Sequence, residues 1–243
     1  MTARTVVLLA VGCLLAGCSS RSPSEPLEIS LSQAGRGILY PANSTGLSPA
    51  VLIVPGEAGI TPGVQQMAQT LHSHGYRVLL VDLYRGEAVA QGDPLDAHIM
   101  SRALDEQQVA NDLRDGLAYL QQQPGPLALL GFDLGGAYAL EAAIRQPLPA
   151  LKLVISIGGR PVTDAAKLAP LQASVLVLYG AKDEGIPAEA REAFRAALAQ
   201  AGKRLLDMPV FERKGDNLLN PPSEADDLAA LDQILATLQS ELR

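Results

Sequence analysis

The sequence predicts a single α/β domain in which a mostly parallel sheet is flanked by helices on both faces. Short apolar runs alternate along the chain with longer stretches of helical periodicity, which is the pattern of βαβ units. No segment repeats another, and residues 27–243 are numerous enough to bury one core. We therefore expect residues 27–243 to form one domain, without a large cap domain inserted in it.

The apolar runs predict the strands in order along the chain. Residues 27–32 and 37–40 are expected to form an antiparallel hairpin on the sheet edge. The runs predicted as the remaining strands are 51–54, 78–81, 127–130, 151–157, 175–179 and 205–211. Pro55-Gly56 directly ends the first of these runs, so the chain is expected to turn there.

Helices are predicted between these runs, at 64–74, 104–120, 137–144, 187–201 and in a final C-terminal segment. Gly202 follows the fourth helix as a C-cap, and Pro187 suits its first turn. Ser223 is predicted to cap the final helix, with Asp226 three residues later. Its buried stripe is expected at Leu228, Leu231, Leu235 and Leu238. A loop is expected at 85–96, and the longest insertion spans only residues 86–101.

The first residues have the features of an export signal. Arg4 precedes an apolar stretch at 6–15 that is too short to span a bilayer. The stretch ends in Leu15-Ala16-Gly17-Cys18, which resembles the bacterial lipobox. That resemblance implies a lipoprotein signal peptide at 1–17 and an acylated, palmitate-bearing Cys18. An ordinary signal peptide cut after small residues is the alternative.

Composition limits the partners of the mature chain. The net charge of −7 argues against nucleic acid and opposes contact with anionic headgroups, so the lipid on Cys18 would make the membrane contact. The polar, Pro- and Ser-rich residues 18–26 are expected to be a flexible tether. Ser19 rather than Asp follows the cysteine. By resemblance to bacterial lipoproteins, this favours anchoring in the outer membrane, with the domain facing the periplasm. Signal cleavage would remove Cys13, leaving no thiol for catalysis.

The most informative motif lies at 131–136, where a predicted strand runs through Gly-Phe-Asp-Leu-Gly-Gly into a predicted helix. This strand–turn–helix context is that of a nucleophile elbow, with Asp133 at its centre. The flanking glycines relieve crowding in so tight a turn. A carboxylate there would be stabilised by the amides and dipole at the helix N-terminus. A plain turn with a capping aspartate is the alternative interpretation.

Several further segments, in the same order, resemble the dienelactone hydrolase family of the α/β-hydrolase fold. The segments are Val51–Gly59 with Glu57, His74–Val78, Val81–Arg85 and Val175–Pro187. The resemblance covers nearly the whole mature domain and implies an α/β-hydrolase fold. It implies that Asp183 is the catalytic acid and that the amides of Ala58 and Leu134 form the oxyanion hole.

The chain departs from this family at two catalytic positions. Asp133 stands where the family has a cysteine or serine nucleophile, and Asp216 stands where it has the histidine base. The chain's three histidines, His72, His74 and His98, all precede the elbow. Because the histidine follows the nucleophile and the acid in this fold, no usual base is available.

Three functions follow from these departures. We favour a membrane-anchored, non-catalytic binding or scaffold protein, that is, a pseudoenzyme with a degenerate triad. The first alternative is a hydrolase of ester, lactone or C–halogen bonds with Asp133 as nucleophile, using Asp216, Glu57 or His98 as base. The second rests on the fold implied by the resemblance, in which the carboxylates of Glu57, Asp133, Asp183 and Asp216 converge on one pocket. Such a pocket would bind a divalent cation or a cationic ligand, with Arg85 neutralising part of the charge. No cofactor is expected, and the protein partner and substrate stay open.

Overall fold

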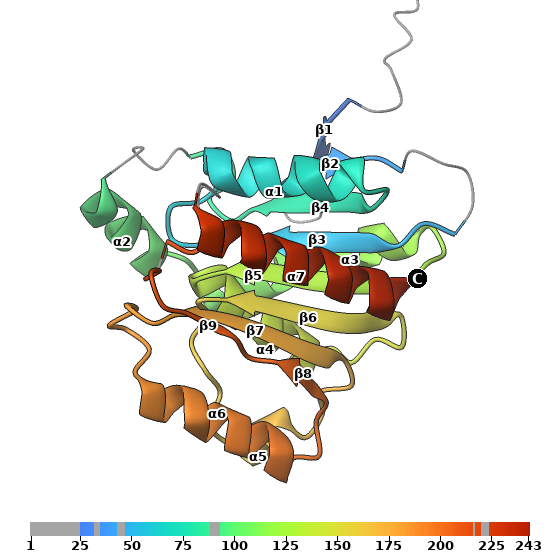
Figure 1. Cartoon of the computed structure of the whole chain (residues 1–243). Helices are drawn as coiled ribbons and strands as arrows, with labels where there is room; N and C mark the ends of the chain where they lie inside the picture. The colour runs from blue at the N-terminus through green and yellow to red at the C-terminus, as the bar shows by residue number, and fades with distance from the viewer. Residues whose placement is uncertain (1–24, 32–34, 43–46, 88–92, 216, 220–223) are drawn as a thin grey trace, which may run out of the picture.

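The computed structural model describes residues 25–31, 35–42, 47–87, 93–215, 217–219 and 224–243 (Figure 1). The predicted signal peptide, Cys18, most of the tether, Asp216 and Ser223 lie outside these residues. Within them, no helix is long and apolar enough to cross a membrane.

One sheet organises the domain, with the strand order β1-β2-β4-β3-β5-β6-β7-β8 and with β9 paired to β7. β1 and β2 pair antiparallel, as does β2 with β4, whereas the other pairs are parallel. The strands are β1 (Leu27–Ser30), β2 (Arg36–Tyr40), β3 (Ala50–Val54), β4 (Arg77–Asp82), β5 (Leu127–Phe132), β6 (Leu151–Ile157), β7 (Ser174–Gly180), β8 (Leu205–Asp207) and β9 (Val210–Phe211). The predicted mostly parallel sheet with an antiparallel edge hairpin is confirmed.

Helices cover both faces of the sheet (Figure 1). One face packs against α1 (Pro62–Ser73) and α7 (Ala225–Leu242), and the other against α3 (Glu106–Gln121), α4 (Leu134–Arg145) and α6 (Ala188–Gln200). The remaining helices are α2 (Pro94–Arg102) and the short α5 (Ala165–Leu168). The fold therefore has three layers.

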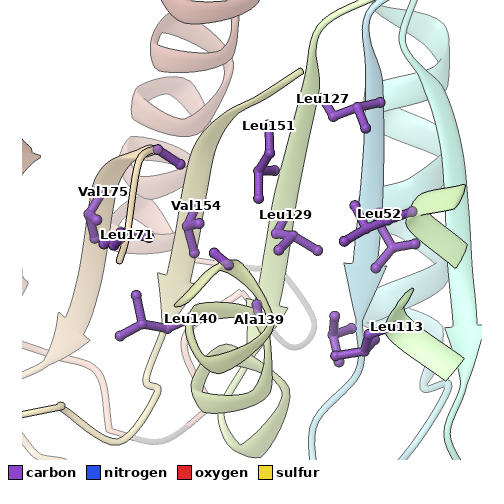
Figure 2. Packing of buried hydrophobic residues seen from close by; sticks show 14 of the residues in the cluster. Leu52, Leu113, Leu127, Leu129, Ala139, Leu140, Leu151, Val154, Leu171 and Val175 are labelled. Atoms are coloured by element: carbon purple, nitrogen blue, oxygen red, sulfur yellow. The ribbon is translucent and has the colours of Figure 1, made fainter. Parts of the chain in front are cut away.

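Each central strand contributes to two separate cores. In β3, Leu52 and Val54 belong to the core beneath α3 and α4, while Val51 and Ile53 belong to the core beneath α1 and α7. Leu129 and Val154 continue the first core on β5 and β6 (Figure 2). Since successive side chains point to opposite faces, a strand buried on both faces must be apolar throughout. This is why the strand sequences are continuous apolar runs.

The structure corrects several local expectations. The predicted loop at 85–96 gives way to helix earlier, because α2 begins at Pro94 after the N-cap Asp93. The final helix begins at Ala225, with Glu224 and Asp227 forming the capping box in place of Ser223 and Asp226.

Its predicted buried stripe is confirmed in part. Leu238 is buried, and Leu231 and Leu235 are partly buried against the core, but Leu228 is 57% exposed. The other buried apolar positions are Ala230, Ile234 and Leu242. With Leu238, these positions recur at a spacing of four residues, and Leu228 lies on a neighbouring, exposed side of the same helix. The predicted last strand is also divided, into β8 and β9, which both pair with β7.

A buried arginine closes the end of the sheet that lies opposite the carboxyl ends of the parallel strands. Arg77 is only 2% exposed, and its guanidinium donates to the Leu120 carbonyl at 2.6 Å and to the Gln123 side chain. The carbonyls at a helix C-terminus carry partial negative charge and lack partners within the helix. Arg77 therefore caps α3 from β4, although burial lowers its pKa.

We predict that Arg77→Met lowers the free energy of unfolding by about 2 kcal/mol, because it leaves buried carbonyls without a donor. Arg114→Met on the exposed side of α3 is the matched control and should change it by less than about 0.5 kcal/mol. Urea unfolding monitored by circular dichroism measures both values. Equal effects of the two substitutions would contradict the capping role of Arg77.

Candidate active site

Asp133 lies between β5 and α4 in a strained backbone conformation. Its φ of 47° and ψ of −116° are unfavourable for any residue with a Cβ atom. Its amide donates to the Ile157 carbonyl at 2.6 Å, and its own carbonyl accepts from Gly136 at 2.9 Å. Its side chain makes no hydrogen bond that caps α4. The predicted elbow is therefore present as a backbone structure.

Glycines around the elbow leave no room for side chains. A Cβ at position 131 would lie 2.1 Å from the Gly135 carbonyl oxygen, and one at 135 would lie 2.3 Å from the Pro55 carbonyl oxygen. Gly56 faces Asp133, because a Cβ there would lie 3.5 Å from Asp133 Oδ2. The carboxylate of Asp133 is thus directed toward the turn that follows β3.

That turn carries Glu57 and Ala58, and Tyr84 holds it. The Tyr84 hydroxyl donates to the Glu57 carbonyl at 2.6 Å. Burial raises the pKa of Tyr84 to about 12, with further contributions from the negative charges of Glu57 and Asp133. Both carboxylates thus lie near one phenol, as the resemblance implied. Tyr84 stood in a matched segment, but its role was not predicted.

Asp183 follows β7, on the loop predicted to carry the acid. Its Oδ1 accepts from the Gly185 amide at 2.9 Å, and its charge contributes to the raised pKa of the buried Tyr179. The Lys182 amide donates to the Lys214 carbonyl at 2.8 Å. The segment ending at Gly215 therefore lies beside the Asp183 loop, although Asp216 itself is outside the described residues.

A buried ion pair anchors this second segment. Lys214 Nζ lies 2.7 Å from Asp227 Oδ2, and their side chains are 5% and 0% exposed. The two oxygens of Asp227 also accept from the amides of Leu219 and Glu224 at 2.8 and 3.0 Å. Asp227 thus joins the start of α7 to the loop that follows β9. This ion pair was not predicted from the sequence.

Two other candidate residues have definite partners. Arg85, itself at a φ of 56°, contacts Asp112 at 2.9 and 3.0 Å. Burial outweighs this contact and raises the pKa of Asp112. His98, on α2, lies beside the turn that follows β3, with its Nδ1 3.7 Å from Glu57 Oε2. His72 and His74 lie at the end of α1, where His72 contacts the Tyr40 ring.

The cation alternative gains no support from the described residues. Among residues 25–31, 35–42, 47–87, 93–215, 217–219 and 224–243, no group of three or more His, Cys, Asp or Glu side chains is placed to hold a metal ion. Asp216, one member of the expected cluster, lies outside these residues.

The sheet order, the helices on both faces and the elbow after β5 define an α/β-hydrolase fold. A family model described as the dienelactone hydrolase family matches residues 36–237. The chain therefore belongs to the dienelactone hydrolase family, as its motifs predicted.

Individual relatives agree with this assignment. A carboxymethylenebutenolidase from Pseudomonas sp. is 34% identical over 132 residues, which cover 49% of this chain and 55% of the relative. The chain spans about half the length of the curated relatives it matches, from 37% to 57%.

Solved structures share the fold. The dienelactone hydrolase from Anabaena variabilis superimposes with a TM-score of 0.66 at 24% identity, covering 90% of this chain and 98% of that one. A dienelactone hydrolase-like promiscuous phosphotriesterase from metagenomic libraries gives a TM-score of 0.71 at 22% identity, covering 90% and 98%.

We predict that Asp133→Gly stabilises the domain by about 1 kcal/mol, because glycine tolerates the positive φ at this position. Asp133→Ala keeps the Cβ and should show no such gain. Thermal and urea unfolding of the two variants measure the difference. A stabilised Asp133→Ala would show that charge, rather than backbone strain, limits stability here.

We predict that Asp227→Asn lowers the free energy of unfolding by about 3 kcal/mol, because it removes the close carboxylate of the buried Lys214 ammonium and leaves only Glu224, whose Oε2 is 3.4 Å away and whose side chain is exposed. Asp232→Asn, on the exposed side of the same helix, is the control and should have little effect. Hydrogen exchange of the Leu219 amide, which donates to Asp227, should accelerate only in Asp227→Asn. Unchanged exchange there would contradict the anchoring role.

Proposed function

We propose that this chain binds a small neutral carbonyl compound at the elbow and does not hydrolyse it by triad chemistry. One observation carries the proposal: a carboxylate, Asp133, occupies the elbow, and no histidine follows residue 98 in the sequence. An acyl-transfer triad needs a hydroxyl or thiol nucleophile and a base in contact with it. Both groups are replaced in this chain.

The ligand class follows from the groups that remain. Leu134 is the first residue of α4, so its amide has no partner within the helix, and Ala58 follows Glu57 in the facing turn. Such amides bind a carbonyl oxygen. The negative charges of Asp133 and Glu57 oppose an anionic ligand, whereas Asp133 would accept a hydrogen bond from a ligand hydroxyl. A neutral ester or lactone suits this arrangement.

The name of one relative supports the lactone part of this ligand class. The Pseudomonas relative is named a carboxymethylenebutenolidase, and a butenolide is an unsaturated lactone. The carboxyl group in that name is anionic at neutral pH, and the charges of Asp133 and Glu57 would oppose it in this chain. We infer that this chain keeps affinity for lactones while lacking the groups that open them. We further propose that acylated Cys18 anchors the domain to the outer membrane of the cell envelope. The domain would then face the periplasm. The lipobox-like residues 15–18 support this placement.

One contact favours a second candidate function. His98 lies 3.7 Å from Glu57, on the turn that faces Asp133. A histidine paired with a carboxylate is a competent general base. In that case Asp133 would displace a leaving group such as halide from carbon to form an ester. Water deprotonated by His98 would then cleave the ester and restore Asp133.

We predict no turnover of p-nitrophenyl acetate, γ-lactones or haloalkanes by the wild-type chain above that of Asp133→Ala. The spectrophotometric or pH-stat rate of product release measures this. Isothermal titration calorimetry should detect binding of a γ-lactone to the wild-type chain. The dissociation constant should differ in Asp133→Ala.

Each other outcome has a definite meaning. Ester or lactone turnover that disappears in Asp133→Ala would refute the non-hydrolytic function. Haloalkane turnover that disappears in both Asp133→Ala and His98→Asn would establish the second candidate function. Asp133→Ser and Asp133→Cys should stay inactive toward esters, since neither supplies a base.

A further inference from the structure

Helix α2 presents two large apolar side chains to solvent instead of to the protein. Leu95 and Ile99 are 67% and 58% exposed, whereas the residues that the helix buries are the small Ala97 and Ser101. No side chain of α2 belongs to either hydrophobic core within the described residues. The helix lies beyond the ends of the strands and not on a face of the sheet (Figure 1). Leu95 and Ile99 therefore add little to the packing of the domain.

One contact places this helix beside the elbow. His98 Nδ1 lies 3.7 Å from Oε2 of Glu57, on the turn that follows β3. The same turn faces Asp133, since a Cβ at Gly56 would lie 3.5 Å from Asp133 Oδ2. Helix α2 therefore borders the site that we propose binds a lactone.

Helical spacing continues the surface from this contact to the exposed apolar residues. Residues three and four positions apart are neighbours on a helix surface, with about 5–6 Å between their Cβ atoms. Leu95 is three residues from His98 and four from Ile99, so it lies between them on the helix surface. A molecule that extends from the elbow past His98 would meet Leu95 first and Ile99 next.

The size of this apolar surface suits a small ligand better than a protein. Two exposed side chains form it, whereas a stable protein interface takes about 20–30 residues from each partner. An alkyl chain needs only a few apolar side chains to lie on. The apolar surface of α2 and the neighbouring elbow thus suit two parts of one molecule.

We propose that the ligand of the elbow carries an alkyl chain, which lies across Leu95 and Ile99. This inference rests on the lactone binding proposed above and names the ligand class more closely, as a lactone substituted with an alkyl chain. The ring lies at Asp133, and the chain passes beside His98 to α2. Contact with Leu95 and Ile99 removes apolar surface of both partners from water, which favours the substituted lactone over the bare ring.

Isothermal titration calorimetry of the full-length chain tests the proposal with γ-butyrolactone, γ-octalactone and γ-decalactone, which differ in the alkyl chain on the same ring. We expect affinity to rise about twofold for each methylene, less than the roughly fourfold gain of complete burial. γ-Octalactone should therefore bind about tenfold more tightly than γ-butyrolactone. Leu95→Ser with Ile99→Ser should reduce this preference to about twofold or less.

Two further variants separate the apolar surface from other effects of substitution. Leu95→Met with Ile99→Met keeps the surface apolar and should retain the preference for the longer lactones. Leu47→Ser is the control for loss of an exposed leucine. Leu47 is 77% exposed and precedes β3, at the end of the strands opposite the elbow, so all three affinities should stay unchanged.

The outcomes distinguish this inference from the function on which it rests. Equal affinities of the three lactones for the wild-type chain would overturn the alkyl chain and leave lactone binding at the elbow intact. Binding of none of them would refute both. A preference that persists in Leu95→Ser with Ile99→Ser would overturn α2 as the site of the chain. A lower solution mass of that variant by light scattering, with unchanged affinities, would show a contact between copies and also overturn the proposal.

Discussion

The strained backbone at Asp133 is the constraint on which the site depends. A residue with a Cβ is held at a φ of 47° because β5 and α4 are both fixed by their packing on the sheet. The end of β5, the start of α4 and the turn after β3 lie so close together that Gly131 and Gly135 have no space for a side chain. In the hydrolases of this fold the same turn exposes a nucleophile. Here the turn is retained while its side chain is a carboxylate.

That substitution changes what the site can do. A carboxylate at the start of α4 lies at the positive end of the helix dipole. It is also a weak reagent toward esters, since attack would produce a mixed anhydride that still needs an activated water. The Tyr84 hydroxyl donates to the Glu57 carbonyl, so a hydrogen-bonded turn that carries a second carboxylate faces Asp133. These features support the proposal that the site binds a ligand without acyl transfer.

Much of the fold could be predicted from the sequence because local patterns determine it. Continuous apolar runs gave the central strands, and the glycine spacing around Asp133 gave the elbow. Long-range contacts could not be predicted in this way. Nothing near His98 in the sequence indicates its contact with Glu57, and nothing near Lys214 indicates Asp227. Leu228 was misplaced because α7 buries the neighbouring Asp227 instead, and only the contact with Lys214 in the folded chain explains a buried aspartate.

The most direct test is to restore the two missing groups together, with Asp133→Cys and Asp216→His in one chain. If the elbow and the Asp183 loop keep the geometry of the family, the double variant should hydrolyse p-nitrophenyl acetate with a burst of acyl-enzyme, while each single variant stays inactive. Stopped-flow release of p-nitrophenol measures this. A folded double variant without turnover, or a wild-type chain that already hydrolyses the ester, would contradict the view that this site has the fold of a hydrolase but not its reacting groups.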